Sequence, residues 1–351
     1  MRRLLVVIGL SGLWPVALPA QTSDNSLRVV TSLTTYASIA AEILGDAGTV
    51  TAIAQGDENP HFVQPRPSFL RGLQQADVFI TTGLDLELWV PALLDRASNR
   101  RLSSGGSGYV TAYTGVPLLD IPESVSRSEG DIHVFGNPHI WTDPINAILI
   151  GRNIATGLKN ASPANAEVFE ARYMEWRGRV IRAHVGDELV ELLGTDVVID
   201  LASGGGGGLW EFLNSQSYQG RPLVERLGGW MKQAEVFRGR SMVCYHKEWD
   251  YFTRAFDVPC IEYIEPKPGI PPTPRHVANV IRLMRSEGIP VLFSTNYYDR
   301  NQIERVAART GARAVVVPSN TRGAEGVDSY IDLVSLWVSE LAAAFQASES
   351  R

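Results

Sequence analysis

The sequence has few of the residues and patterns that mark the common classes of enzyme. It contains two cysteines and six histidines among 351 residues. Neither His-Glu-x-x-His, which marks zinc proteases, nor Gly-x-Ser-x-Gly, which marks serine hydrolases, is present. The formal net charge is −6, so the chain lacks the positive field that attracts nucleic acid or an anionic membrane. We therefore expect no nucleic-acid partner.

Long hydrophobic runs are also missing beyond the first 20 residues. Residues 1–20 begin with Arg2 and Arg3, continue with a short apolar run over 4–18, and end in Ala20 at a plausible cleavage site. This pattern predicts a signal peptide, and the run is shorter than the ~20 residues that a membrane anchor needs. No cysteine follows the cleavage site, so we expect no lipid attachment and a free chain in a bacterial periplasm.

The two cysteines, Cys244 and Cys260, each fall in a predicted strand. An oxidising compartment permits a disulfide between them. Two buried free thiols are the equal alternative, because sequence alone does not give the geometry that a disulfide requires.

Hydrophobic residues make up 44% of the chain, and its length suffices for two domains. Strands alternate with helices in both halves, which predicts an α/β fold with parallel sheets flanked by helices. In such sheets, ligands bind outside the carboxyl ends of the strands. The strands are predicted at 27–33, 49–54, 78–82, 241–245, 260–264, 290–295 and 312–317.

A long helix is predicted between the two halves, from Pro163 to about Leu193, where apolar residues recur at helical spacing. Thirty helical residues would span about 45 Å and form a rigid strut. Two shorter helices, broken near Gly178 or Gly186, are the alternative. The expected domains are a signal peptide (1–20), an N-terminal metal-binding lobe (21–160), a linking helix (161–193) and a C-terminal lobe (194–351).

Two segments carry weaker signals. Residues 101–136 are rich in glycine, serine and polar residues, which predicts an irregular surface loop. Five consecutive glycines occupy 204–208, but no Lys-Ser or Lys-Thr follows them as a phosphate-binding loop requires. We therefore expect a flexible turn there.

The tripeptide Asn-Pro-His occurs twice, at 59–61 and at 137–139. Proline fixes its own φ and favours an extended conformation for the preceding asparagine, so each histidine follows a stiff turn. After the second tripeptide, Asp143 and Pro144 have the residue types of a helix N-cap and a first helical position. Two histidines on two braced loops suggest one shared site.

A third histidine, His246, stands at the end of a predicted strand. His61, His139 and His246 thus all end or follow strands, and neutral imidazole is a good ligand for Zn²⁺. Ligands from both halves would place the metal between the lobes. His133, in the loop before His139, is either a solvent-exposed residue or an accessory residue that catches or shields the ligand.

The chain resembles the periplasmic zinc and manganese solute-binding proteins of ABC importers. The segments that carry the resemblance are 56–71, 76–89, 137–146, 243–252 and 326–330, which are spread over most of the mature chain in the right order. The resemblance implies two lobes joined by one long helix, a metal held at their interface, and delivery of that metal to a membrane ABC permease. It implies a binding protein, not an enzyme, and we expect a monomer.

The resemblance maps three family ligands onto His61, His139 and His246. A histidine in the third position is similar to the zinc-preferring members, whereas manganese members more often have a harder carboxylate there. We therefore expect Zn²⁺ as the transported ligand, with Mn²⁺ less favoured.

The fourth family ligand, an acid after the last strand, is missing here. Its position falls on Pro318, beside Ser319, and Pro60 occupies the alternative position before the first histidine. The histidine-rich loop of many zinc members is missing too. Water could fill the fourth position, and the acids that could supply it are Asp57, Glu58, Glu248 and Asp299. An open position also fits a catalytic zinc, where bound water has a pKa near 7. A zinc-dependent hydrolase with Glu248 as general base is therefore the rival hypothesis.

Overall fold

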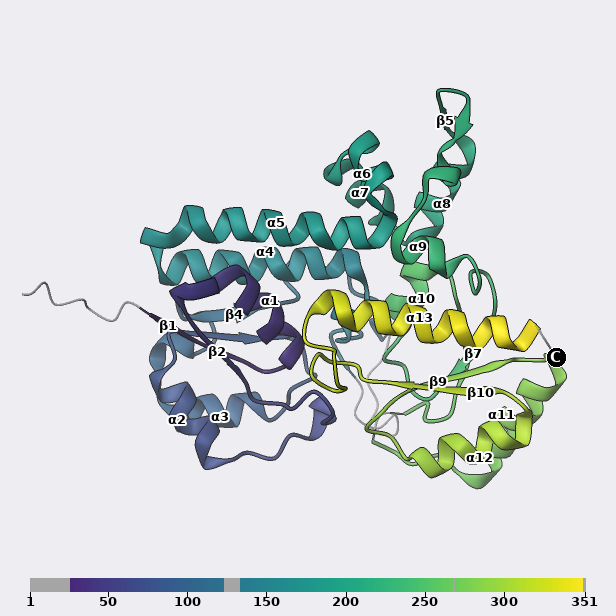
Figure 1. Ribbon diagram of the computed structural model, residues 1–351. Coiled ribbons are helices and arrows are strands. Elements are labelled where there is room, and N and C mark those ends of the chain that lie inside the picture. Colours follow the sequence, from purple (N-terminus) through teal and green to yellow (C-terminus); the bar gives the residue numbers. More distant parts are fainter. Residues whose placement is uncertain (1–25, 123–132, 268, 350–351) are drawn as a thin grey trace, which may run out of the picture.

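The computed structural model describes residues 26–122, 133–267 and 269–349, which form two α/β halves side by side (Figure 1). The expected signal peptide lies outside the described residues. Within the described ranges, every helix is too short or too polar to span a bilayer.

The N-terminal half contains a four-stranded parallel sheet in the order β2-β1-β3-β4. Its strands are β1 (Leu27–Thr31), β2 (Gly48–Ala52), β3 (Val78–Thr81) and β4 (Tyr109–Thr111). The apolar runs of β1 and β3 lie at the centre and are almost wholly buried, as expected of a parallel sheet covered on both faces. The prediction missed β4, because three residues are too few to show a pattern.

The C-terminal half repeats this arrangement with a parallel sheet in the order β10-β9-β7-β8. Its strands are β7 (Met242–Cys244), β8 (Cys260–Tyr263), β9 (Val291–Thr295) and β10 (Arg313–Val317). Cys244 and Cys260 form a disulfide between the neighbouring strands β7 and β8, with their Cα atoms 5.6 Å apart. From the sequence, a disulfide and two free thiols were equal alternatives, and the structure shows the disulfide.

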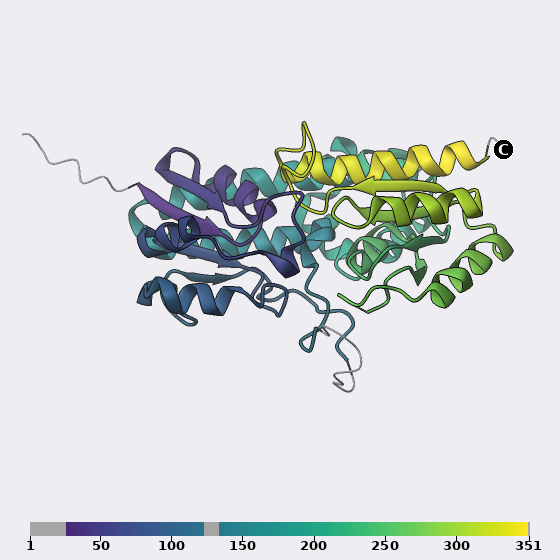
Figure 2. The ribbon, with the colours of Figure 1, turned by 90° about the horizontal axis from the view of Figure 1, so that it is seen from below.

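Helices cover both faces of each sheet (Figures 1 and 2). In the N-terminal half, α1 packs with α4 and α5 on one face, and α2 packs with α3. In the C-terminal half, α13 packs on β10 and α9, and α11 packs with α12 on the opposite side (Figure 1). The bounds are α1 (Thr34–Leu44), α2 (Pro67–Gln75), α3 (Val90–Ala97), α4 (Pro144–Ala161), α5 (Ala166–Val185), α9 (Gly229–Ala234), α10 (Asp250–Phe256), α11 (Pro274–Ser286), α12 (Arg300–Thr310) and α13 (Tyr330–Glu349).

The linking helix is shorter than predicted. Helix α5 ends at Val185 and is followed by a separate helix, α6 (Asp187–Leu193). Gly186 interrupts the helix with a φ of +87°, and a Cβ there would lie 2.7 Å from the Cα of Gly228. One helix to Leu193 is therefore wrong, and the alternative of a break at Gly186 is right. The domain limits themselves remain a prediction.

The segment after α5 projects from the body of the molecule (Figure 1). It contains α6, α7 (Thr195–Ala202), α8 (Gly206–Ser215) and a short hairpin of β5 (Ser217–Tyr218) and β6 (Arg221–Pro222). The five glycines are not simply a flexible turn, since three of them begin α8. A Cβ at Gly206 would lie 2.0 Å from the carbonyl oxygen of Ala255 in α10, so close packing explains this glycine.

Buried hydrogen bonds join the two halves near the C-terminal helix. The indole of Trp141 donates to the carbonyl of Ser319 at 2.7 Å, and the hydroxyl of Tyr330 donates to the carbonyl of Trp141 at 2.9 Å. Thr35 donates to the side chain of Asn320 at 2.8 Å. Breaking the contact between the halves would leave these buried polar groups without partners.

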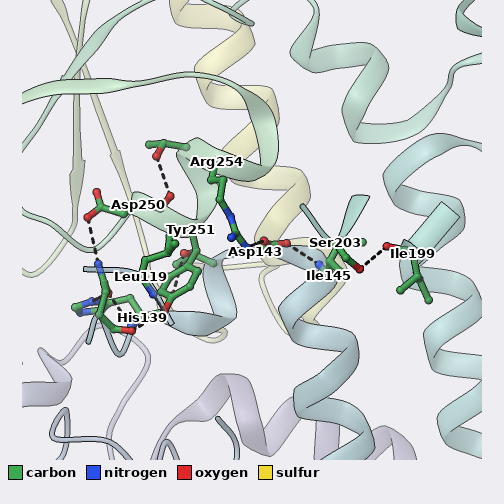
Figure 3. A network of polar contacts seen from close by, with 12 residues as sticks. Leu119, His139, Asp143, Ile145, Ile199, Ser203, Asp250, Tyr251 and Arg254 are labelled. Carbon is green, nitrogen blue, oxygen red and sulfur yellow. Dashed lines mark hydrogen bonds and ion pairs between the residues drawn. The ribbon is translucent and has the colours of Figure 1, made fainter. Parts of the chain in front are cut away.

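A second set of contacts between the halves lies at the start of α4 (Figure 3). The hydroxyl of Tyr251 donates to the carbonyl of Asn137 and accepts from the amide of Leu119. Arg254 pairs with the buried carboxylate of Asp143 at 3.4 Å. Asp143 also caps α4 by accepting from the amide of Ile145, as the sequence predicted. The loop that carries His139 is therefore held from both sides.

Candidate metal site

His61 lies in a short 3₁₀ turn, Pro60–Phe62, just beyond β2. The side chain of Asn59 accepts a hydrogen bond from the backbone amide of His61 at 3.0 Å. The indole of Trp89 donates to the carbonyl of Pro60 at 2.8 Å and holds the turn from the other side. The first Asn-Pro-His tripeptide is thus a braced turn, as predicted, and His61 is buried.

His139 has the same local structure. The side-chain oxygen of Asn137 accepts from the backbone amide of His139 at 3.1 Å and from its ring Nδ1 at 2.9 Å. The second bond fixes the proton on Nδ1 and leaves the lone pair on Nε2. The amide nitrogen of Asn137 donates to the carbonyl of Lys247 at 2.8 Å, in the other half of the molecule. One asparagine therefore orients His139 and ties it to the residue next to His246.

His246 follows the end of β7 and is 2% exposed. Its Nδ1 donates to the carbonyl of Glu265 at 2.8 Å, so its Nε2 also carries a free lone pair. The Glu265 carbonyl belongs to the loop that follows β8. The carboxyl end of the C-terminal sheet thus supplies both the histidine and the group that orients it.

The structure brings the three predicted histidines together between the halves. The Nε2 atoms of His61 and His139 are 3.3 Å apart. Two nitrogens that each bind one tetrahedral zinc ion at about 2.0–2.1 Å lie roughly 3.3 Å from each other, which matches this separation. The ring centroids of His61 and His139 are 5.4 Å apart, and those of His139 and His246 are 6.4 Å apart. Nitrogen lone pairs from both halves therefore converge on one small region.

A fourth histidine joins this cluster, and the sequence did not settle its role. The ring centroid of His133 lies 5.0 Å from that of His61 and 5.8 Å from that of His139. Its side chain is only 12% exposed. The interpretation of His133 as a solvent-exposed loop residue is therefore wrong. The conformation of the loop sets its distance from the other histidines, and sequence spacing does not reveal that conformation.

Burial keeps these imidazoles neutral. It lowers the pKa of His61 and of His139 well below the usual value, and the neighbouring histidines lower both further. Burial also lowers the pKa of His246 to about 4. Removing a charged imidazolium from water is unfavourable, and a neighbouring positive charge adds to that cost. The three side chains are thus in the form that binds a metal ion at neutral pH.

The predicted position of the fourth family ligand is occupied by other contacts. The carbonyl of Pro318 accepts from the indole of Trp337 at 2.6 Å, and the carbonyl of Ser319 accepts from Trp141. Ser319 is 1% exposed. This loop holds the C-terminal helix and the interface between the halves, and it supplies no carboxylate.

The four acids that were considered as the fourth metal ligand are either exposed or bonded to other groups. Glu58 accepts from the amide of Gln55 at 3.2 Å, Asp299 caps α12, and Asp57 is exposed. Glu248 is buried and accepts from Thr295 at 2.6 Å and from the hydroxyl of Tyr297 at 2.5 Å. Burial raises the pKa of Glu248 to about 7. Both of its oxygens are therefore bound to the C-terminal half, and Glu248 is a poor candidate for a general base at the histidines.

The cluster is not yet closed around an ion. Among the residues that the structure describes, no three histidine, cysteine or acidic side chains are already arranged to hold a metal. Four imidazoles on one tetrahedral zinc would have ring centroids roughly 5 Å apart. The 6.4 Å between His139 and His246 is the longest of the four measured separations. Binding would therefore require the His246 ring to approach the others.

Comparison with known proteins identifies the family. The model of the periplasmic zinc-uptake complex component A matches residues 29–184 and 223–344, well over half of the chain. The chain belongs to this family. Its members are the substrate-binding proteins of ABC metal importers and not enzymes, which argues against the hydrolase hypothesis. The unmatched residues between the two ranges include most of the projecting segment.

Individual relatives agree over nearly the full length. The iron-binding protein YfeA of Yersinia pestis is 26% identical, over 97% of this chain and 95% of its own. The metal ABC transporter substrate-binding lipoprotein ScbA of Streptococcus cristatus is 22% identical over the same shares. A manganese-bound periplasmic metal-binding protein from Candidatus Liberibacter asiaticus has a TM-score of 0.63 at 19% identity, covering 90% of this chain and 98% of that one. The crystal structure of ZnuA has a TM-score of 0.65 at 16% identity, covering 91% and 99%.

Proposed function

We propose that this protein captures Zn²⁺ in the periplasm and delivers it to a membrane ABC permease, with His61, His139 and His246 as ligands. The observation that carries the proposal is the meeting of these histidines between the two halves. Two of them have Nδ1 bound to a fixed acceptor, which leaves Nε2 for the metal. No bond of a substrate is made or broken, so the protein's task is selective binding and release.

The ligand type supports zinc over manganese. The relatives are variously named for zinc, for iron or for metals in general, and solved neighbours include manganese-bound ones, so the choice of metal rests on this chain's own donor atoms. Imidazole nitrogen suits the borderline-soft Zn²⁺, whereas Mn²⁺ favours carboxylate and other oxygen ligands. The carboxylates of Glu58, Glu248 and Asp299 have partners elsewhere. We therefore propose Zn²⁺ as the cargo, with Mn²⁺ bound more weakly.

We also propose that the mature chain is free and monomeric. Several relatives, ScbA of Streptococcus cristatus among them, are named lipoproteins, and these names run against a free chain. In this sequence the two cysteines are bonded to each other, so neither is available to carry a lipid.

Release of the ion to the permease need not involve a large hinge motion. The buried hydrogen bonds from Trp141 to Ser319 and from Tyr330 to Trp141 hold the halves together. Opening the interface would break them and leave buried polar groups unpaired, at about 1–3 kcal/mol each. We propose instead that local movement of the loops that carry the histidines releases the metal.

The test of the proposal is the zinc affinity of His139→Ala. Loss of a ligand should weaken zinc binding by more than the roughly 10–100-fold that loss of an outer hydrogen-bond partner costs. Zinc affinity is measured by competition with a chromophoric chelator. The matched control is His276→Ala, because His276 lies on α11 and bonds to the carbonyl of Tyr263, away from the cluster.

The control should bind zinc like the wild type. Thermal unfolding of both variants in the presence of a chelator shows whether the fold survives. If His139→Ala is folded and binds zinc as tightly as the wild type, the site is misassigned.

A further inference from the structure

The Nε2 nitrogen of His133 is buried, and among the described residues it has no hydrogen-bond partner. A buried donor or acceptor without a partner costs about 1–3 kcal/mol, so such an atom calls for an explanation. The distances from His133 to His61 and His139 place this nitrogen beside the proposed metal ligands.

The other ring nitrogen of His133 is held by a carboxylate. Nδ1 lies 3.2 Å from an oxygen of Asp85, a residue of the loop after β3. The second oxygen of Asp85 accepts from the backbone amide of Val134 at 2.7 Å. With its proton on Nδ1 toward the acid, the imidazole has its lone pair on Nε2, as in the carboxylate–histidine–metal arrangement common in zinc proteins.

The backbone around His133 is fixed to the N-terminal half. Its carbonyl accepts from the amide of Gly136 at 3.1 Å, which closes a turn. Gly136 has a φ of +108°, and a Cβ there would lie 2.9 Å from the carbonyl oxygen of Leu119. The next residue, Asn137, donates to that same carbonyl at 2.8 Å. His133 therefore has a defined position relative to His139, only six residues further along.

We propose that His133 is the fourth ligand of the bound zinc ion, through Nε2, and that Asp85 is the positioning residue that orients it. This inference rests on the proposed function and completes its ligand set. It explains how the chain coordinates zinc although Pro318 and Ser319 stand where an acid is expected. Asp85 also places one negative charge beside four neutral ligands and offsets part of the +2 charge of the ion.

Two variants and two measurements test the assignment. His133→Ala removes the ligand, and Asp85→Asn keeps the imidazole but removes the carboxylate charge. Zinc affinity is measured by chelator competition, and the visible spectrum of the protein loaded with Co²⁺ reports the ligand set. His139→Ala and His276→Ala are measured in parallel, the first as a loss of an assigned ligand and the second as a matched histidine outside the cluster.

We expect zinc affinity to fall at least about tenfold in His133→Ala and roughly 10–100-fold in Asp85→Asn. The Co²⁺ spectrum of His133→Ala should change in position and intensity, since water or an open position replaces one nitrogen. Asp85→Asn should retain a spectrum close to that of the wild type. If His133→Ala folds poorly, wild-type zinc affinity in Asp85→Asn would still contradict the assignment, because an imidazole that binds the metal should feel the loss of its carboxylate partner.

The possible failures are distinguishable. If the wild type binds zinc, His139→Ala loses binding, and His133→Ala keeps wild-type affinity and spectrum, the fourth-ligand assignment is overturned while the proposed function stands. A loss of affinity with an unchanged Co²⁺ spectrum would make His133 a shield over the ion and would also overturn the assignment. If the wild type itself binds neither zinc nor cobalt, the proposed function fails, and this inference fails with it.

Discussion

His184 is a buried histidine outside the proposed metal site, and its burial should make the fold sensitive to acid. It lies on α5 with its ring 5.7 Å from that of Phe256 and 6.2 Å from that of Trp230. Its Nδ1 is buried and finds no hydrogen-bond partner in the part of the chain that the structure describes. Burial lowers the pKa of His184 from 6.5 to about 4. The unfolded chain therefore binds this proton more readily than the folded chain between those two pH values.

His184→Phe should reduce the acid sensitivity of folding. The stabilising contribution of a neutral His184 is fully present above pH 6.5 and is lost as the pH falls toward 4. Between pH 7 and pH 5 the free energy of unfolding should fall by about 2 kcal/mol less in the variant than in the wild type. Urea unfolding at the two pH values, in the presence of a chelator, measures this. Equal pH dependence in both proteins would show that His184 does not contribute.

Some features of the site could be predicted from the local sequence, and others depend on contacts between residues far apart in the chain. The prolines of the two Asn-Pro-His tripeptides were enough to predict a stiff turn before each histidine, but the side-chain bonds by which Asn59 and Asn137 brace these turns were not predicted. His133 depends on Asp85, 48 positions away, and no local pattern indicates that contact. The bond from Asn137 to Lys247 likewise joins distant parts of the chain.

At the scale of elements, the end of α5 depends on a glycine. Gly186→Ala should lower the free energy of unfolding by about 1–3 kcal/mol, because a φ of +87° is strained for alanine and its Cβ would collide with Gly228. The matched control is Gly178→Ala in the middle of the same helix, where a Cβ would meet nothing within 4 Å. Alanine there should stabilise by roughly 0.5–1 kcal/mol.

Urea denaturation of the two glycine variants and the wild type gives the comparison. Opposite signs for the two substitutions would support the assignment of Gly186 as the break between α5 and α6. A Gly186→Ala variant as stable as Gly178→Ala would contradict it.

The disulfide between β7 and β8 should stabilise the C-terminal sheet. Cys244 and Cys260 are 16 positions apart, and closing a loop of that length is worth roughly 3 kcal/mol in the unfolded chain. The double variant Cys244→Ala/Cys260→Ala should lose about that much free energy of unfolding. Reduced wild-type protein is the control, because it lacks the bond but keeps both sulfur atoms. Its free energy of unfolding should fall by a similar amount. A loss below about 1 kcal/mol in both would show that the bond contributes little.

The elements that the sequence predicted best are those whose local pattern and tertiary role agree. Strands β1, β3 and β9 are buried, largely apolar runs that lie within the predicted ranges. Prediction failed where tertiary contact decided the conformation. Helix α8 begins with three glycines although glycine is a poor helix former, and α10 approaches closely at the first of them, Gly206. Whether the two cysteines were bonded was equally beyond the sequence.

At the scale of the whole molecule, the two sheets present their strand ends to a shared interface, where the histidines lie. His61 follows a strand of one sheet and His246 follows a strand of the other. The topology and the family were accessible from the order of motifs along the chain. The ligand set beyond three histidines was not, because it depends on how a loop folds over the site. The projecting segment, from α6 to β6, lies outside the residues that the family model matches.

The most direct measurement is a metal-binding titration of the purified mature protein with Zn²⁺ and Mn²⁺ in competition. The triple variant His61→Ala/His139→Ala/His246→Ala is the control. The account predicts one zinc ion per chain, retained against an excess of manganese, and no zinc binding by the folded triple variant. A protein that binds neither ion, or one from which manganese displaces zinc at equal concentration, would contradict it.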